Sequence, residues 1–560
     1  MKKLLLISFT LLCSQAWATG TCTAGAIATA AVGPTPVSIS GCWYVSAGGS
    51  DTNNGTTEAT AFAHAPGMQN CTNNCASASV GALNGVIFRG GGDSWGNTSY
   101  MWSLSSGTTG NPTYYGADVS WFSGGLWTKP LLTAGGTAIG NNDDTMISVP
   151  ANVTFGPFEI TGFFWSPTAC TNSPPFGECG IFDAGQNSGQ TVEYVYIHGW
   201  THSGTDSSYC GSNTCIVATV WAAGNGGNSV WHDTVVTGQD VANDHSMSVW
   251  FDGPPIGYNN YCRQAASCSL QAFPTDWHSN TITDVGPAWC NTPSVTGCTH
   301  ENGFEDDGDT GFLFYNNLIS NVHAGIAITI APYPTYTANV FNNVMVGNDM
   351  GGDANVIGFG PPVYNSGLCS GHTVNNYCTG AGTFIMENNT IECGSDSQLF
   401  DSCQSNVGLP GTGTTPDATI YRNNHFISAT TASGCGGSAV NCTFAASNIV
   451  QTLATANGQG YNSSQTYAFS PTLGGSTIGA GSNQTSGWPG PNTNDTSYGC
   501  TDASNVATCP ARISNPRPPT GTWNSGAYQF VQGNGGPCIA CFAYDAHKTW
   551  KTTEKCCKGQ

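Results

Sequence analysis

The chain is patterned by a short motif in which a polar pair, often Asn-Asn, precedes apolar residues at alternate positions and then a turn. Clear copies are "FYNNLISNV" (314–322), "FNNVMVGN" (341–348), "MENNTIECG" (386–394) and "YRNNHFIS" (421–428), and looser copies are "FEITG" (158–162), "VWHDTVVTG" (230–238) and "WHSNTITDVG" (277–286). Alternation of apolar and polar side chains is typical of a strand with one buried face. No long amphipathic helix pattern accompanies these motifs, so the sequence predicts an all-β fold.

The spacing of the motifs indicates a solenoid with inserted loops. Asn317 and Asn343 are 26 residues apart, which suits one coil, whereas Asp233 and Asn280 are 47 residues apart. Aligned copies place one polar residue each in a shared column, where stacked amides satisfy one another and the turn backbone. We expect this column to be structural, and its members are Asp233, Asn280, Asn317, Asn343, Asn389 and Asn424.

Segments near both ends resemble a known superfamily. "CWYVSAGGSDTNNGTTEATAF" (42–62), followed by "GVIFRGGGDSW" (85–95), resembles the opening of secreted pectate-lyase-like proteins, and "GTWNSGAYQF" (521–530) resembles their closing strand. The resemblance implies a single-stranded right-handed parallel β-helix solenoid over residues 42–530, in which Asp51 belongs to an N-terminal turn. It implies no single activity, because the superfamily contains polysaccharide lyases, glycoside hydrolases, epimerases, phage tailspikes and adhesins.

The two ends of the chain differ from the repeats. Residues 1–18 have the lysines, the apolar run and the Ala-Trp-Ala ending of a secretory signal peptide. Residues 19–41 are then an N-terminal extension or cap, and residues 531–560 are a tail with four lysines and four cysteines. No later segment is apolar enough to span a membrane, so we expect a secreted, surface-associated or periplasmic protein.

The cysteines agree with export. Of the 25, Cys13 lies in the predicted signal peptide, and most of the others form close sequential couples. They do not form the paired CxxC motifs of a zinc site, so we expect local disulfides that restrain loops. The expected couples are Cys22/Cys42, Cys71/Cys75, Cys170/Cys179, Cys210/Cys215, Cys262/Cys268, Cys290/Cys298, Cys369/Cys378, Cys393/Cys403, Cys435/Cys442 and Cys500/Cys509.

The charge of the chain restricts its partners. The formal net charge is -21, and charged residues make up 8% of the sequence. Nucleic acid is excluded, because binding phosphates needs clustered Lys and Arg. An acidic polysaccharide would be repelled unless a cation intervened, so a neutral extracellular polysaccharide is the easier partner.

Acidic residues nevertheless concentrate in "HENGFEDDGDTGF" (300–312). An upstream segment has the same layout, with His245 seven residues before Asp252, as His300 is seven residues before Asp307. We therefore expect these two segments to occupy equivalent places on adjacent coils, whose strands are about 4.8 Å apart.

Strand alternation then predicts which residues of these segments face outward. Phe304 and Ile328 are expected side by side on the core face of neighbouring coils. The residues that alternate with the core-facing ones, in this segment and in its equivalents on other coils, then form one outward patch that is mainly acidic. Its members are Asp183, Trp250, Asp252, Glu301, Glu305 and Asp307.

Glycoside hydrolysis is the first interpretation of this patch, because crowded carboxylates acquire different pKa values, as an acid and its ionised partner require. Asp252 and Asp307 would be the acid and the base or nucleophile, Glu305 the alternate, and His300 would orient one carboxylate. The other candidates would contact the substrate: Trp250, Asp183, Glu301 and His245.

The second interpretation is calcium held by Asp252, Glu305 and Asp307, because clustered hard oxygen ligands suit Ca²⁺. Calcium would be structural or would serve a polysaccharide lyase by neutralising a uronate, with Arg263 as the nearby cation. The third is a surface scaffold or adhesin without catalysis. The sequence requires no other cofactor and leaves the oligomeric state open. We favour a carbohydrate-active hydrolase, because acids concentrate in a chain otherwise poor in them.

Overall fold

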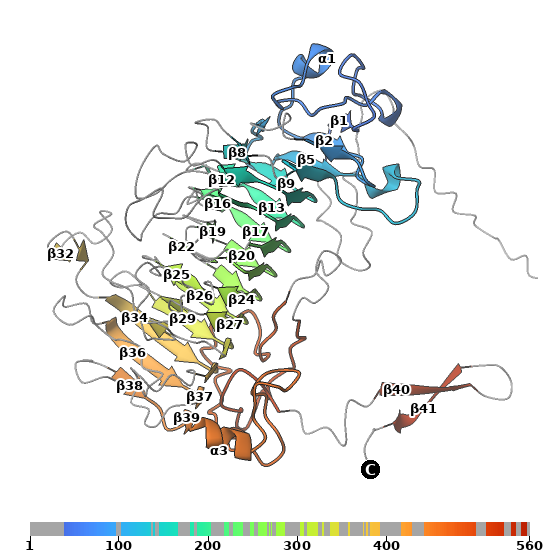
Figure 1. Cartoon of the computed structure of the whole chain (residues 1–560). Helices are drawn as coiled ribbons and strands as arrows, with labels where there is room; N and C mark the ends of the chain where they lie inside the picture. Colours follow the sequence, from blue (N-terminus) through green and yellow to red (C-terminus); the bar gives the residue numbers. More distant parts are fainter. Residues whose placement is uncertain are drawn as a thin grey trace, which may run out of the picture.

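The chain forms the right-handed parallel β-helix expected from the sequence, in which successive coils add strands to sheets that wrap around one core (Figure 1). The computed structural model describes residues 39–96, 102–135, 138–139, 145–165, 180–183, 187–202, 218–222, 228–238, 247–250, 256–265, 268, 270–271, 276–285, 303–306, 311–322, 328–329, 337–346, 357–358, 373–374, 377–378, 381–392, 416–427, 442–499, 511–530, 539–544 and 550–556.

Two long parallel sheets run the length of the helix. Sheet 1 consists, in spatial order, of β1 (Gly41–Val45), β2 (Asn84–Phe88), β5 (Thr113–Ala117), β9 (Val153–Phe155), β13 (Thr191–Glu193), β17 (Val230–His232), β20 (Ile256–Tyr258), β23 (Asp276–His278), β26 (Phe312–Tyr315), β29 (Thr337–Phe341), β34 (Ala381–Glu387), β36 (Pro416–Arg422) and β38 (Cys442–Phe444). Sheet 2 consists of β3 (Ser94–Trp95), β6 (Leu131–Thr133), β10 (Glu159–Thr161), β14 (Tyr196–His198), β18 (Val235–Thr237), β21 (Tyr261–Arg263), β24 (Thr281–Val285), β27 (Leu318–Val322), β30 (Val344–Val346), β35 (Thr390–Glu392), β37 (His425–Ile427) and β39 (Ile449–Gln451).

Shorter strands close the coils on the third side, which we call sheet 3. Its first part consists of β4 (Trp102–Ser103), β8 (Thr145–Ser148), β12 (Gly180–Asp183), β16 (Ala218–Ala222) and β19 (Met247–Trp250), and its second part of β22 (Leu270–Gln271), β25 (Phe304–Asp306), β28 (Ile328–Thr329) and β31 (Ile357–Gly358). The remaining elements are β7 (Ala138–Ile139), β11 (Phe164–Trp165), β15 (Thr201–His202), β32 (Thr373–Val374), β33 (Tyr377–Cys378), β40 (Ile539–Tyr544), β41 (Trp550–Cys556), η1 (Glu58–Thr60), α1 (Asn73–Ala76), η3 (Val119–Trp121) and α3 (Leu453–Gly458).

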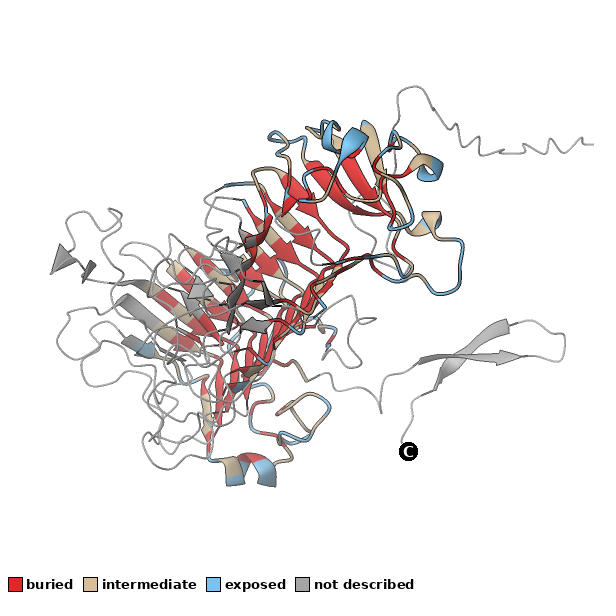
Figure 2. Ribbon diagram, turned by 45° about the horizontal axis from the view of Figure 1, so that its top comes forward, coloured by how far each residue is buried: buried red, intermediate tan, exposed pale blue. Residues whose placement is uncertain are grey.

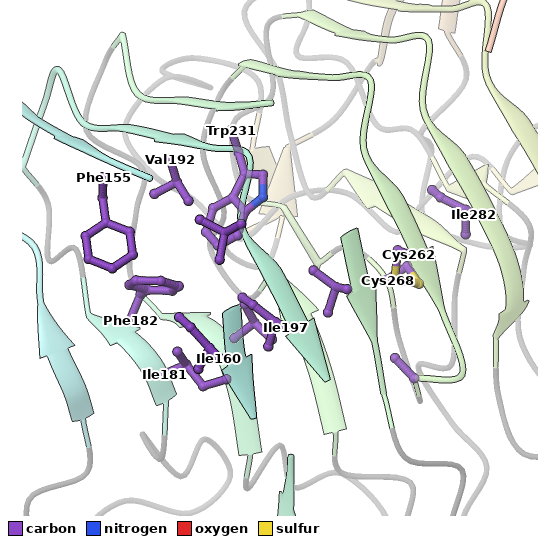
Figure 3. Packing of buried hydrophobic residues seen from close by; sticks show 14 of the residues in the cluster. Phe155, Ile160, Ile181, Phe182, Val192, Ile197, Trp231, Cys262, Cys268 and Ile282 are labelled. Carbon is purple, nitrogen blue, oxygen red and sulfur yellow. A yellow bond between two sulfur atoms is a disulfide. The ribbon is translucent and has the colours of Figure 1, made fainter. Parts of the chain in front are cut away.

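The coils enclose a core of apolar side chains (Figure 3), and most of the described strands are coloured as buried (Figure 2). The ring of Phe182 in sheet 3 lies 5.3 Å from that of Phe155 and 5.6 Å from that of Trp231, both in sheet 1. Ile160 and Ile197 pair in register in sheet 2 and are fully buried with them. Because side chains alternate along a strand, the residues on either side of these positions face outward.

A ladder of asparagine side chains occupies the corner between sheets 1 and 2, as the Asn-Asn motifs predict. The backbone N–H of Asn280 donates to Oδ1 of Asn317 at 3.0 Å, and that of Asn317 donates to Oδ1 of Asn343 at 3.0 Å. The amide of Asn317 donates in turn to the Trp277 carbonyl of the preceding coil at 3.1 Å. These buried bonds hold neighbouring coils in register. The ladder includes Asn260, Asn280, Asn317, Asn343, Asn389, Asn424 and Asn448.

The assignment of Asp233 to this column is wrong by one residue. Thr234 holds the ladder position, since its N–H donates to Oδ1 of Asn260 at 3.2 Å. Asp233 takes the preceding position, with φ of 51°, as Asn259 does on the next coil with φ of 55°. The coil of Asn259 and Asn260 also divides the long interval that precedes Asn280, so that interval contains a complete coil and not only an inserted loop.

The first residue of each polar pair has its own role. It adopts the left-handed conformation that Asn and Asp tolerate, and this conformation turns the chain from sheet 1 to sheet 2 in two residues. Asn342 has φ of 56° and donates from Nδ2 to the Asn494 carbonyl at 2.8 Å. Asn423 has the same φ and donates to the Ser482 carbonyl at 2.8 Å. The first asparagines therefore hold the C-terminal segment, while the second form the ladder.

That C-terminal segment, 452–499 with 511–530, runs back along the outside of the helix (Figure 1). Tyr461, Phe469 and Tyr498 belong to one buried cluster with Leu318 and Val344, on the outward face of sheet 2. The segment 521–530 is not the expected closing strand. Its described residues form an isolated bridge at Trp523 and otherwise pack over the corner, because their backbone groups bond to the first asparagines of the pairs.

The N-terminal turn matches expectation. The carboxylate of Asp51 is buried and accepts hydrogen bonds from the backbone of Ala63, His64 and Thr72 and from the His64 ring at 2.9 Å. Burial alone would raise the pKa of Asp51, but these hydrogen bonds outweigh it and lower the pKa. The Asp51 carboxylate therefore has a structural role in this turn.

Local disulfides are confirmed where the described residues include both cysteines. Cys71 bonds to Cys75, and Cys262 bonds to Cys268 across a loop of sheet 2 (Figure 3). Cys42 is also disulfide-bonded. Each of the other expected couples has at least one cysteine outside the described residues. The predicted signal peptide also lies outside them. Within the described part, no helix is long and apolar enough to cross a membrane.

Replacing a ladder residue should destabilise the helix by breaking bonds to both neighbouring coils. In Asn317→Ala, the N–H and Nδ2 of Asn280 lose their acceptor, and Oδ1 of Asn343 loses a donor. Buried groups left unpaired should lower the free energy of unfolding by about 2–3 kcal/mol, measured by urea denaturation. The control Asn339→Ala, at a half-buried position on β29, should change it by less than about 0.5 kcal/mol. Equal effects of the two changes would contradict the role of the ladder.

Candidate functional site

The structure describes part of the predicted site. Asp183, Trp250 and Glu305 lie in sheet 3, where the structure gives strand register, and Arg263 lies in sheet 2 with its contacts. The other predicted site residues lie outside the described residues: His245, Asp252, His300, Glu301 and Asp307.

The coils of Asp252 and Glu305 are not adjacent, contrary to the sequence alignment. Asp252 follows β19 in the sequence, whereas Glu305 lies in β25, and β22 lies between these strands. At about 4.8 Å per strand, the two coils are about 9.6 Å apart, twice the expected separation. The alignment missed the short coil of β22 because it treated that part of the chain as an inserted loop.

Trp250 has a register position that the alignment did not predict. It pairs with Trp221, which pairs with Phe182. Phe182 is fully buried in the core, and the expectation that Trp250 faces outward stays a prediction. Asp183 occupies the next position along β12, beside Ala222 and Ser148.

Glu305 holds the predicted register position. Phe304 pairs with Ile328, and both are fully buried, as strand alternation predicts. Glu305 pairs in register with Thr329 on one side and with Leu270 on the other.

Arg263 is on the outward face of sheet 2, away from the sheet that carries the acidic segment. Its guanidinium carbon lies 5.5 Å from the centre of the Tyr261 ring, and its Nε donates to Oγ1 of Thr237 at 3.2 Å. Thr237 in turn pairs in register with His198 on the preceding coil. An outward column therefore runs from His198 through Thr237 to Arg263 along the helix axis.

His198 is held in a fixed orientation by the coil before it. Its Nε2 lies 2.9 Å from Oε1 of Glu159, and its Nδ1 lies 3.2 Å from Oγ1 of Thr161. The Tyr196 ring stacks on the imidazole with centroids 4.2 Å apart. The side chains of His198 and Glu159 are 28% and 30% exposed, so a ligand can reach them. We call this set the His198 cluster: Glu159, Thr161, Tyr196, His198, Thr237 and Arg263.

The His198 cluster contains the groups needed to move a proton beside a bound anion. A carboxylate at Nε2 favours a proton there, which leaves Nδ1 of His198 as the acceptor; it accepts from the Thr161 hydroxyl until a substrate proton displaces that bond. Burial raises the pKa of Tyr196, and although Arg263 opposes the shift, Glu159 adds to it, so the phenol stays protonated at neutral pH. Arg263 offers a positive charge that suits a carboxylate.

The sequence carried a signal for this cluster. "VYIHG" (195–199) aligns with the motif "FEITG" (158–162), and the structure confirms this register, since Glu159 pairs with Tyr196 and Thr161 with His198. Ionisable residues occupy three of the four outward positions of these two successive motifs, namely Glu159, Tyr196 and His198, and the fourth is Thr161.

The described residues include no group of three or more His, Cys, Asp and Glu placed to hold a metal ion. Of the predicted calcium ligands, Asp252 and Asp307 lie outside those residues, so the calcium hypothesis stays a prediction.

Comparisons with known proteins add no activity. No family model matches the chain, and no curated protein matches it. Among solved structures, it is similar to pectate lyase Pel9A (12% identity, 92% of this chain and 94% of that one, TM-score 0.37) and to a rhamnogalacturonan lyase (13%, 73% and 86%, TM-score 0.32). It is also similar to a PL6-family polysaccharide lyase from Pseudopedobacter saltans (13%, 68% and 91%, TM-score 0.36). At these identities and TM-scores, the likeness assigns no function.

A second ionic group lies on the outward face of sheet 1. Nδ1 of His232 is 2.7 Å from Asp233, and Nε2 is 3.2 Å from Glu193. Burial alone would lower the pKa of His232, but the hydrogen bonds to both carboxylates outweigh it and raise the pKa to about 9. The ring also stacks on Tyr258, with centroids 4.7 Å apart. Because these side chains are nearly buried and fully paired, we assign them to stability.

The His232 ion pairs should make the free energy of unfolding decrease as the pH becomes alkaline. A histidine whose pKa is raised on folding contributes stability that is complete below about pH 6.5 and is lost as pH rises through about 9. His232→Gln should therefore lower the free energy of unfolding at pH 7 by about 3 kcal/mol, and the difference from the original protein should shrink at pH 10. Urea denaturation at both pH values measures this. A difference that stays constant with pH would show that the imidazole is not held as a cation.

Proposed function

We propose that this chain is an exported carbohydrate-active enzyme that cleaves an extracellular polysaccharide by β-elimination at the His198 cluster. The observation that supports this most directly is the outward His198 imidazole, held by Glu159 and stacked on Tyr196, with Arg263 in the same column. A base, an acid and a cation on one accessible face are what this reaction requires. The proposed substrate is a polysaccharide that contains a uronate, because Arg263 can bind its carboxylate.

The reaction follows from these groups. Arg263 neutralises the uronate carboxylate, which makes the adjacent C5 proton more acidic. Nδ1 of His198 takes this proton, the C5–H electron pair forms a double bond between C4 and C5, and the C4–O4 bond breaks. The leaving oxygen takes a proton from the Tyr196 hydroxyl, and solvent then restores both side chains. No water enters the product.

The position of the cluster suits a long substrate. The C-terminal segment covers sheet 2 from Leu318 onward, whereas Glu159, His198 and Arg263 lie on earlier coils and stay partly exposed. Successive strands here are about 4.8 Å apart, so a polymer lying along the axis would contact several coils. The acidic chain would slow the approach of a polyuronate, and we expect binding to strengthen with added salt.

Paired-carboxylate hydrolysis is the alternative, and the observation that favours it is the register of Glu305, which directly follows the buried Phe304. In this proposal Asp252 and Asp307 are acid and base, with Glu305 as the alternate and His300 as the orienting group. Coils about 9.6 Å apart would suit an inverting more than a retaining mechanism. Asp183, Glu301 and His245 would contact the sugar, and calcium held by Asp252, Glu305 and Asp307 would instead belong to a lyase.

Product mass spectrometry should separate these proposals. The mature protein is incubated with polygalacturonate, alginate, xylan and mannan, with and without calcium. We expect unsaturated fragments from an acidic substrate, each lighter by one water than a hydrolytic fragment. Fragments that carry an added water would instead support hydrolysis by Asp252 and Asp307. Intact polymers across the panel would favour a scaffold or adhesin.

Substitutions should locate the reaction. His198→Ala should lower kcat by about 10²–10⁴-fold because the base is lost, and Arg263→Ala should mainly raise KM. Arg89→Ala, which removes a half-exposed arginine in the first coils, is the matched control and should leave both constants unchanged. Circular dichroism confirms that each variant folds. Full activity in His198→Ala, together with none in Asp307→Asn, would move the site to sheet 3.

A further inference from the structure

The outward face of sheet 1 carries a second surface with the features of a binding site. On β20, β23 and β26, Ile256, Asp276 and Leu313 pair in register and form one outward column. Two residues further along, Tyr258, His278 and Tyr315 form a parallel column. Both columns are half-buried apart from Tyr315, which is 5% exposed. We call these six residues the Asp276 face. It lies on a different sheet from the His198 cluster.

The Asp276 carboxylate has no hydrogen-bond donor beside it among the described residues. Its Oδ1 is buried, and no donor reaches it among the described residues. The neighbouring coils place Ile256 on one side and Leu313 on the other, so the carboxyl group has apolar flanks. Burial raises the pKa of Asp276 to about 6. A carboxyl group held this way costs stability, because its lost contacts with water are not replaced.

The second column of the Asp276 face, formed by Tyr258, His278 and Tyr315, is held rigid by stacking. The His278 ring stacks between Tyr258 and Tyr315, with centroids 5.1 Å and 4.8 Å apart. The two tyrosines keep their protons at neutral pH, because burial raises the pKa of Tyr258 to about 12 and raises that of Tyr315 as well. Stacked rings cover one another's faces, so the column presents ring edges and polar groups to a ligand.

We propose that the Asp276 face binds a neutral sugar unit of a polysaccharide, with the Asp276 carboxylate accepting hydrogen bonds from sugar hydroxyls. A sugar ring has hydroxyl donors at its edge and apolar C–H groups on its faces, which match the carboxylate and the flanking Ile256 and Leu313. Oδ1 is too deeply buried for a ligand to reach, so the sugar hydroxyls would bond to Oδ2 of the same carboxylate. This site would hold substrate without cleaving it, and it does not depend on the chemistry at His198.

Other ligand classes fit this face less well. A metal ion needs several oxygen or nitrogen ligands, and Asp276 stands without a second carboxylate in its column. An anion would be repelled by Asp276, and the described residues of this face include no arginine to bind it. A purely apolar ligand would leave the carboxylate unpaired. Neutral hydroxyl groups satisfy the face without adding charge.

The proposal predicts a pH dependence of binding. Hydroxyl donors favour the ionised carboxylate, so the sugar should lower the pKa of Asp276 and bind more tightly above pH 6 than below it. Among the described residues, the titratable groups that face Asp276 are Tyr258 on β20, His278 on β23 and Tyr315 on β26. Burial lowers the pKa of His278 to about 4, with Asp233 opposing, so none of these three changes charge between pH 5 and pH 7.

Titration calorimetry tests this with cellohexaose, xylohexaose and mannohexaose as neutral probes. For at least one probe, affinity should rise at least threefold from pH 5 to pH 7. At pH 6, binding should release protons, measured in two buffers with different ionisation enthalpies. Asp276→Asn keeps the shape of the side chain and should weaken binding at pH 7 by about tenfold, with no proton release. Asp284→Asn, on β24 of the same coil, is the matched control and should bind like the original protein.

Three results would overturn the proposal. They are absence of binding by all three hexasaccharides, equal affinity of Asp276→Asn and the original protein, and proton release that persists in Asp276→Asn. His198→Ala should bind these probes normally, because the two sites are on different sheets. The Asp276 face can therefore fail while β-elimination stands, and the reverse also holds.

Discussion

The asparagine ladder fixes the register on which every other feature of this molecule depends. Each ladder amide bonds to the coil before it and to the next ladder side chain, so no coil can slip by one residue without losing buried hydrogen bonds. A one-residue slip would also turn each core side chain outward. The columns of His198, Thr237 and Arg263 and of Ile256, Asp276 and Leu313 exist because this corner sets the same starting point for each strand.

The two long sheets use their outward faces differently. On sheet 1, rings stack from His232 to Phe341 along one column, and the groups near them are nearly buried. On sheet 2, the C-terminal segment covers the later coils and leaves the earlier ones partly exposed. The chemistry at His198 is therefore accessible because the covering segment ends before it. Sheet 1 thus combines a stabilising column of rings with the half-buried Asp276 face, whereas the uncovered part of sheet 2 carries the proposed chemistry.

Much of the fold could be predicted from the sequence. Its apolar and polar residues alternate as the strands require, and its asparagine pairs recur at the corner between sheets 1 and 2. The ladder column was correct for Asn280 and the later asparagines, but wrong for Asp233, since a polar pair does not reveal which member turns the chain. The coil of Asn260 was missed because Cys262 replaces the usual aliphatic residue in its core position. The candidate site was harder to predict, because contacts such as Glu159–His198 join residues 39 apart through pairing of coils.

The corner between sheets 1 and 2 has a consequence for how such a chain changes length. From His232 to His425, each described passage from sheet 1 to sheet 2 takes two residues, the first left-handed and the second in the ladder. An extra residue at that corner would separate the ladder bonds on both sides, whereas whole coils can be added or removed between equivalent asparagines. Evolution can thus lengthen the molecule in units of one coil, and can vary loops freely only at the other two corners.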